Sequence, residues 1–321
     1  MKKYFIILFL IFNIIFISAQ DAENSEKNNS EKKEKKGNRL TLEEYNEGMK
    51  KYKKFYNNDT QKLKGNIDVY YKIFDTMSTK GYINLNVNLV FEILDFKKLK
   101  SDKFNINFKA KDNMDFKYNK NFDFKREEIY VNKEGNGVFI VDFKLEKGLY
   151  KDIKISVNGN KGENASIDID EYKLIDLSEE TTKISDVILM NSLNTVRKKM
   201  FFRRNKYFIV PTLSQKYIKN RNFGFYFEYY HLHTDALYNE GDYRVKYSLT
   251  YMITDQEIYS KTEEEENVGE NGQFLAFLNL SSAPQGIYKL YIEFQDYKSD
   301  KIISRTKYFI IENENKNNED K

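Results

Sequence analysis

Apolar and polar residues alternate with a period of two over much of this chain. Between Tyr82 and Ile93, for example, Ile83, Leu85 and Val87 alternate with asparagines. This pattern is typical of a β-strand with one buried face. It recurs in Phe104–Phe108, Phe116–Phe124, Val138–Leu145, Phe225–Leu232, Tyr243–Ile253, Phe274–Leu280, Tyr288–Phe294 and Ile302–Ile311. Clusters of Asp, Asn, Lys and Gly separate these segments, so the pattern predicts an all-β fold.

An internal repeat divides the strands into two groups. Gly148-Leu149-Tyr150 follows one alternating segment, and Gly286-Ile287-Tyr288 follows another in the second half. We expect each glycine to take a positive φ and each tyrosine to place its ring in a core. The repeat predicts two tandem antiparallel β-sandwiches of the immunoglobulin or fibronectin type III kind. Their predicted bounds are residues 66–176 and 184–312.

The first residues predict export. Lys2 and Lys3 precede the apolar run Phe5–Ile17, and Ser18 and Ala19 then provide small residues for cleavage. Residues 1–19 are therefore predicted to be a signal peptide, with a retained anchor as the alternative. We expect a periplasmic or extracellular protein with no transmembrane segment after cleavage. Residues 20–40 are predicted to be a disordered charged linker, and residues 313–321 a polar tail.

One amphipathic helix is predicted at residues 41–57. Thr41 and Glu44 have the spacing of a capping box, and apolar residues follow at intervals of three and four. Gly48 is the weak point of this helix. We expect the helix to pack on the first sandwich, with recruitment of a partner as the alternative.

The second half resembles bacterial proteins named for their GWxTD motif. The resemblance is carried by Ser185–Leu189, Phe208–Pro211, Phe227–Leu232 and Gly286–Tyr288. In that family such segments belong to β-sandwich modules that precede the named domain, so the resemblance implies a sandwich in which Pro211 ends a strand. This chain has no Trp. The GWxTD motif itself is therefore missing, and with it whatever the named domain contributes.

Composition argues against several function classes. The 53 Lys and Arg residues nearly balance the 49 Asp and Glu residues, whereas a nucleic-acid-binding protein usually has a concentrated basic excess. The sequence contains no Cys, no G-x-S-x-G nucleophile elbow and no strand-loop-helix pattern for binding phosphate. We therefore expect neither an enzyme nor a bound cofactor, and no nucleic acid as a partner.

The two histidines are a weak candidate for a metal site. His231 and His233 lie two residues apart in a predicted strand, so their side chains would share one face, and Asp235 could add an oxygen ligand. No further His or Cys is available to complete a zinc site. Ordinary strand histidines are the favoured interpretation, without stoichiometric metal.

Three other features are candidate interaction sites. Tyr226 and Tyr230 lie on the second face of an aromatic strand, which is either covered by a neighbouring element or left bare to bind protein or sugar; we favour the covered alternative. Arg203 and Arg204 lie in a basic cluster that would suit an anionic ligand, but solvation of a turn is the favoured explanation. The acidic run Glu263–Glu266 is expected to be a solvated loop.

Two functions are compatible with these features. The first is a non-catalytic extracytoplasmic scaffold that presents loops and sheet edges to an envelope or secreted protein. The second is a glycan-binding protein of the cell surface or periplasm. Trp is the commonest platform for sugars, and its absence favours the scaffold.

Overall fold

The structure of the chain is a computed structural model. It describes residues 41–59, 61–77, 84–146, 148–174, 177, 181–194, 202–204, 207–219 and 223–313. The predicted signal peptide, the predicted linker and all but the first residue of the predicted tail lie outside these ranges. The described residues between 45 and 313 belong to one compact unit. In the part of the chain that the structure describes, no helix is both long and apolar enough to span a membrane.

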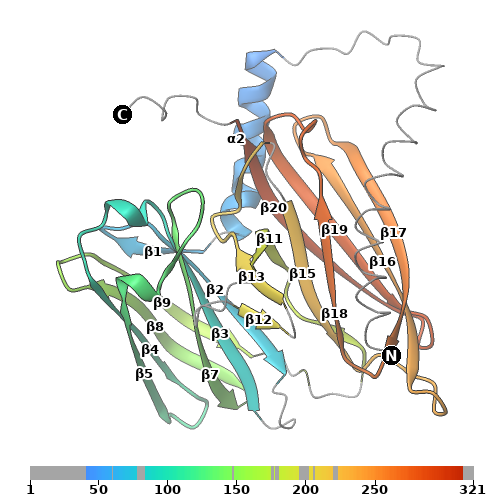
Figure 1. The fold of residues 1–321 in the computed structure, drawn as a ribbon, viewed down its shortest axis with the longest axis horizontal. Coiled ribbons are helices and arrows are strands. Elements are labelled where there is room, and N and C mark those ends of the chain that lie inside the picture. Colours follow the sequence, from blue (N-terminus) through green and yellow to red (C-terminus); the bar gives the residue numbers. More distant parts are fainter. Residues whose placement is uncertain are drawn as a thin grey trace, which may run out of the picture. The chain divides into compact units, whose positions relative to one another are not determined.

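The predicted all-β fold is confirmed: the described residues form one α-helix and two groups of strands (Figure 1). The first group is β1 Lys62–Gly65, β2 Val69–Met77, β3 Asn84–Ile93, β4 Lys103–Lys111, β5 Lys117–Lys125, β6 Tyr130–Val131, β7 Gly137–Glu146, β8 Leu149–Gly159 and β9 Asn164–Lys173. The second is β10 Lys183–Ile184, β11 Ile188–Asn194, β12 Phe202–Arg204, β13 Tyr207–Pro211, β14 Lys216–Ile218, β15 Phe223–Tyr230, β16 Glu240–Tyr251, β17 Gln256–Val268, β18 Gly272–Leu278, β19 Gly286–Asp296 and β20 Lys301–Glu312.

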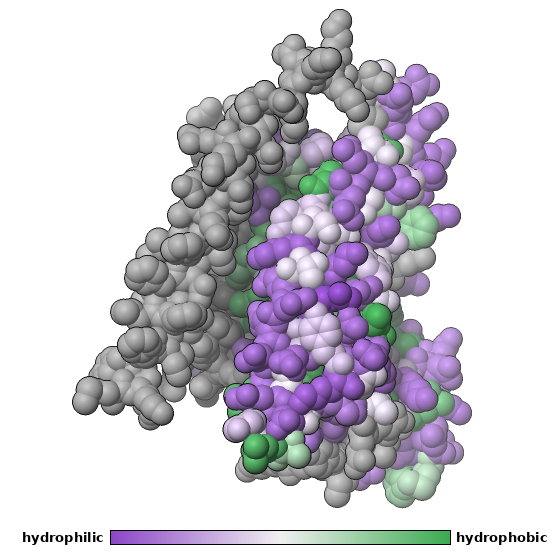
Figure 2. Space-filling view, turned by 90° about the vertical axis from the view of Figure 1, so that its right-hand side faces the viewer, coloured by the Kyte–Doolittle hydropathy of each residue, from purple (hydrophilic) through white to green (hydrophobic). Residues whose placement is uncertain are grey.

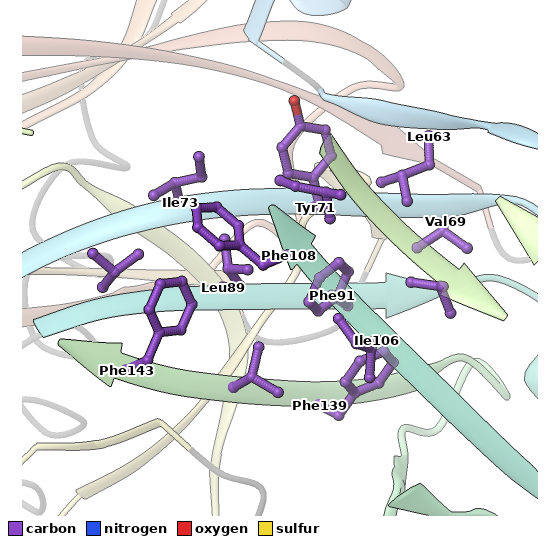
Figure 3. Close-up of a cluster of buried hydrophobic side chains, with 14 of the residues drawn as sticks. Leu63, Val69, Tyr71, Ile73, Leu89, Phe91, Ile106, Phe108, Phe139 and Phe143 are labelled. Atoms are coloured by element: carbon purple, nitrogen blue, oxygen red, sulfur yellow. The ribbon is translucent and has the colours of Figure 1, made fainter. Parts of the chain in front are cut away.

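In the first sandwich, β1 joins two halves of one continuous sheet. Among the described strands the order is β5-β4-β8-β9-β1-β2-β3-β7-β6. β1 pairs with β2 on one side and with β9 on the other, so the halves face each other across an apolar core (Figure 3). Leu63 of β1 is buried in this core. The sandwich therefore begins at Lys62, before the predicted bound at residue 66, because this short strand closes it.

The second sandwich has two sheets. One has the order β10-β15-β11-β13-β12 with β18 also on β15, and the other has the order β14-β20-β19-β16-β17. Alternate residues of both sheets meet in one aromatic-rich core. Almost all pairs are antiparallel as predicted, but β14 lies parallel to β20.

The repeated Gly-x-Tyr segments form the same structure in both sandwiches. Gly148 and Gly286 have φ angles of 156° and 147°, which residues with a Cβ rarely adopt. Tyr150 donates a hydrogen bond to the Glu146 carbonyl over 2.8 Å, and Tyr288 donates one to the Pro284 carbonyl over 2.6 Å. Both rings are buried. Each segment is thus a tyrosine corner, in which the ring fills the core while the hydroxyl ties down the preceding turn.

The helix α2 (Leu42–Asp59) packs on the second sandwich, so the expected contact with the first one is wrong. Tyr56, with Met49 and Tyr52 beside it, covers apolar residues on the outer face of the β16-β19-β20 sheet, namely Met252, Ile287 and Ile310. A Cβ at Gly48 would lie 2.7 Å from Cγ2 of Ile253. The glycine that weakens the helix therefore lets it approach the sheet closely.

The acidic run Glu263–Glu266 is part of the long strand β17, so the expected loop is also wrong. Its carboxylates are used by tyrosines of the neighbouring strand β16. Tyr243 donates to Glu265 over 2.6 Å, and Tyr247 donates to Glu263. Burial and these acidic partners raise the pKa of both tyrosines. The tyrosine partners explain why acidic residues are tolerated in this strand, which lies at the edge of the sheet.

The two sandwiches contact each other through a buried junction. Phe74 and Val90 from the first pack against Ile188, Met190 and Tyr226 from the second. This contact covers the outer face of β15 and of part of β3, which explains why both faces of β15 are buried.

Polar groups also join the sandwiches. Asp186 contacts Lys72 of the first sandwich at 2.7 Å and Lys307 of the second at 3.0 Å. Glu92 of β3 is fully buried and accepts a hydrogen bond from the Ser214 backbone N–H over 2.7 Å. Burial raises the pKa of the Glu92 carboxyl, and this hydrogen bond partly opposes the rise. A buried carboxyl is tolerated in this place because Asn136 of the first sandwich and the Ser214 backbone of the second each donate a hydrogen bond to it.

Candidate functional site

The two histidines do not share a strand face. β15 ends at Tyr230, and His231 has a left-handed φ of 54°, so the chain leaves the sheet before His233. The predicted placement in a strand is therefore wrong. A left-handed residue redirects the backbone, which breaks the alternation on which the prediction depended.

Each histidine has a partner of its own. His231 is buried, and its Nε2 lies 2.7 Å from the Leu177 carbonyl. The Nδ1 of His233 lies 2.7 Å from Oδ2 of Asp296. Asp235 faces neither ring but accepts hydrogen bonds within its own turn. Within the described ranges, no group of three or more His, Cys, Asp or Glu side chains is arranged to hold a metal ion.

Asp296 is the centre of a buried polar network at the end of β19. Its side chain is fully buried and accepts hydrogen bonds from the Thr182 hydroxyl, the His233 ring and the Lys298 backbone N–H. Burial disfavours its ionisation, but the hydrogen bonds from Thr182 and His233 outweigh burial and hold the pKa of the carboxyl below its usual value. Asp296 is therefore an anion that ties three loops together.

Two of the segments that Asp296 contacts, those of His233 and Lys298, lie with the β17–β18 turn at one end of the second sandwich, which we call the loop end. It comprises residues 231–239 between β15 and β16, Val268 at the end of β17 with residues 269–271 before β18, and Asp296 at the end of β19 with residues 297–300 before β20. The strand pairing brings them together, because Glu240 of β16 lies opposite Val268 of β17, and Tyr243 lies opposite Asp296.

The turn after Asp235 is held in several ways. Oδ1 of Asp235 accepts the backbone N–H groups of Leu237 and Tyr238 over 2.8 and 3.1 Å. These two bonds lower the pKa of the Asp235 carboxyl. The Gly269 N–H donates to the Asn239 carbonyl over 2.7 Å, which links this turn to the next loop. Lys298 lies 3.9 Å from Asp235 and reaches it from the third loop.

The braced loops expose large apolar side chains. Leu237 is 77% exposed, Val268 74% and Tyr238 69%. Much of the coloured surface on the side shown in Figure 2 is hydrophilic. Binding residues are often carried on loops that a rigid framework positions, and exposed apolar and aromatic residues are what protein interfaces bury. This arrangement makes the loop end the candidate functional site.

The predicted interaction residues in β15 are not at the surface. Tyr226 and Tyr230 are both buried against the first sandwich. Both hydroxyls donate to Glu228, which lies between them on the same face of the strand. The covered alternative is therefore the one that the structure shows, and this face is closed to a partner.

The remaining predicted residues have separate places. Arg203 and Arg204 lie in β12, which pairs with β13, and their side chains lie outside the described part of the structure. Their interaction with an anionic ligand stays a prediction. Pro211 is the last residue of β13 and is buried opposite Met190.

Sequence reasoning missed the acids that hold the structure together. Every second residue of β19 is buried, and Asp296 continues this pattern two residues after Phe294. An acidic residue at a core position could therefore have been recognised in the sequence as a buried anion. Glu92 gave no such signal, because it lies on the face of β3 that the alternation assigns to solvent.

Comparisons with known proteins do not assign the chain to a family. No protein-family model matches the sequence, and no curated protein matches it either. The comparison with solved structures finds a likeness to a DUF4785 family protein from Legionella pneumophila, with a TM-score of 0.21 and 9% sequence identity. The likeness covers 75% of this chain and 55% of that one, so this chain spans about half of its length. The resemblance to GWxTD-motif proteins stays a prediction.

Proposed function

We propose that the protein is exported and acts as a non-catalytic scaffold that binds an extracytoplasmic protein through the loop end. Export rests on residues 1–19 of the sequence, which have the charged start, apolar run and small residues of a signal peptide. N-terminal sequencing of the exported protein should find Gln20 at or near its start. An intact Met1 in the membrane fraction would instead indicate a retained anchor.

The observation that carries the binding role is the convergence of Leu237, Tyr238 and Val268 on braced loops. A loop that is already ordered loses little conformational entropy when a partner binds, so more of the interaction energy contributes to affinity. Aromatic and apolar anchors at the centre of an interface contribute most of its binding energy. The tyrosine adds a hydroxyl that can hydrogen-bond at the rim of the same contact.

The junction between the sandwiches supports a scaffold. Lys72 of the first sandwich forms an ion pair with Asp186 of the second across it, beside the apolar contact of Phe74 and Val90. Because the two modules contact each other through buried apolar and charged groups, the second sandwich can bind a partner while the first is held to a different molecule.

The test is co-purification of partners from the envelope of the producing cell. The loop-end variant carries Leu237→Ser and Tyr238→Ser. The chain offers a matched control in the β4–β5 turn, where Met114 and Phe116 are 73% and 62% exposed, so Met114→Ser with Phe116→Ser changes a similar apolar area on the first sandwich.

We expect the loop-end variant to lose a specific protein partner by about tenfold or more, because an interface anchor contributes 2 kcal/mol or more. The control variant should retain it. Equal loss in both variants, or retention in both, would exclude the loop end as the binding site.

A further inference from the structure

We propose that the first sandwich has a separate binding groove for an uncharged oligosaccharide, on the outer face of β4, β5 and β8. The groove has a volume of about 740 Å³, which lies in the range of small-molecule sites. Seven of its ten lining residues have hydrogen-bonding side chains: the asparagines both donate and accept, the lysines donate, and the acidic residues accept. The seven include Lys103, Asn105, Asp123, Lys125, Asn158 and Asn160.

Strand register places the amide groups in rows. Asn105 of β4 lies opposite Asp123 of β5 on one side and opposite Asn158 of β8 on the other. Neighbouring strands are about 4.8 Å apart, so these three side chains form a row of polar groups with a spacing close to the length of one sugar ring. Asn107 continues the pattern in the next row, opposite Asn121 and Ser156.

The polar groups of the groove are held in place before any ligand arrives. Asn105 Nδ2 donates to Asp123 Oδ1 over 2.9 Å. Asn160 Oδ1 accepts the backbone N–H groups of Asp102 and Lys103 over 3.0 and 3.2 Å, which fixes the turn after β8 at the rim. Such fixed amide and carboxylate groups can bind hydroxyl groups without first paying the entropy of ordering.

The charges in the groove indicate a neutral ligand. Lys103 and Lys125 are balanced by Asp123 and Glu128, all of which line the groove. A site for phosphate or for a nucleic acid would present a cationic excess. A balanced set of donors and acceptors is suited to a ligand whose hydroxyl groups both donate and accept. The two aromatic residues of the lining, Phe104 and Phe124, also pack in the core, so recognition depends on hydrogen bonds.

This site is independent of the proposed function, because it lies on the other sandwich and uses none of the loop-end residues. The experiment is isothermal titration of the full exported chain with maltopentaose, cellopentaose, mannopentaose and chitotetraose. A sulfated heparin oligosaccharide serves as the anionic comparison. We expect at least one neutral oligosaccharide to bind and the heparin oligosaccharide not to bind.

Variants then locate the site. Asn105→Ala and Asn158→Ala should each weaken binding about tenfold, because each removes a hydrogen-bonding group that contacts the ligand. Asn119→Ala is the matched control, since Asn119 lies on the same outer face but does not line the groove. Melting curves should show that all three variants fold. Absence of binding by every neutral oligosaccharide, preference for the heparin oligosaccharide, or equal weakening in the control would each overturn the proposal.

Discussion

The two sandwiches contain the same tyrosine corner in different surroundings. A Cβ at Gly148 would meet no atom within 4 Å, whereas a Cβ at Gly286 would lie 2.7 Å from Cε2 of Tyr251 and 3.0 Å from Cδ1 of Ile253. Both glycines allow the positive φ angle of the turn, but only Gly286 also leaves space for side chains of a neighbouring segment. The repeat in the sequence therefore encodes a shared backbone turn and leaves its packing, and the surface around it, free to differ.

The outer surfaces differ in the same way. Each sandwich has a turn in which an aspartate side chain accepts hydrogen bonds from the backbone N–H groups of two exposed apolar residues. Asp112 accepts them from Met114 and Phe116, and Asp235 accepts them from Leu237 and Tyr238. Only the second of these turns is tied to two neighbouring loops. Convergence of loops, and not exposure alone, distinguishes the candidate site.

The largest difference between the sandwiches is expected from Gly286→Ala compared with Gly148→Ala. Both variants force a side chain into an unfavourable φ, which costs about 2 kcal/mol. Gly286→Ala adds a steric clash of about 2 kcal/mol, so its free energy of unfolding should fall about twice as far. Urea denaturation of the two variants measures this, and hydrogen exchange locates the loss. Equal destabilisation would mean that Tyr251 and Ile253 move aside freely.

Glu163→Gln should affect only the first sandwich. Partial desolvation opposes ionisation of Glu163, but hydrogen bonds from the Ser101 side chain and from the backbone N–H groups of Lys100 and Ser101 outweigh it and lower its pKa to about 2. A lowered pKa stabilises the fold above the unfolded value of about 4.3, and this stabilisation is lost as the pH falls towards 2.

The Glu163→Gln variant should therefore lose about 2 kcal/mol of unfolding free energy at neutral pH. The difference from the wild type should shrink between about pH 4 and pH 2. Thermal unfolding at a series of pH values measures it. A constant difference across that range would show that the charge of Glu163 does not matter.

Tyr150→Phe and Tyr288→Phe should have small and matched effects. Each removes one hydroxyl-to-carbonyl hydrogen bond and keeps the buried ring, so each should cost about 1 kcal/mol. Chemical denaturation of both variants tests whether the corners are equivalent. A much larger loss for one of them would show that its hydroxyl has a role beyond the turn.

The smallest stability effect is expected from Asp235→Ala and Asp112→Ala. Each removes a side-chain cap of an exposed turn, at a cost of about 0.5 kcal/mol. They should differ in partner binding, because only Asp235→Ala loosens the loop end. Co-purification from the envelope compares them directly. If both variants bind the partner equally well, bracing of the loop end is unimportant.

Much of the fold could be predicted because its determinants are local. Alternation located β15, β16, β18, β19 and β20 within a few residues but not the short strands β10–β14 or the acidic part of β17, and the Gly-x-Tyr repeat predicted both corners. Non-local contacts were not predictable in this way. The helix packs on the second sandwich because it buries the apolar residues Ile287 and Ile310 there. The acidic run Glu263–Glu266 lies in a strand because tyrosines of β16 donate hydrogen bonds to two of its carboxylates.

The candidate site was predictable only in part. The sequence placed His233 and Asp235 near the end of a strand but could not show that His233 contacts Asp296, which lies 63 residues away. The exposed residues Leu237 and Tyr238 form no motif. Their role depends on the loops around them, which only the fold brings together.

The most direct test of the scaffold account is site-specific photo-crosslinking in the producing cell. A photoreactive phenylalanine analogue replaces Tyr238 in one strain and Phe116, the exposed aromatic residue of the first sandwich, in another. The account predicts a discrete protein adduct from position 238 and none of that mass from position 116. The same adduct from both positions, or a protein adduct from position 116 alone, would contradict the assignment of binding to the loop end.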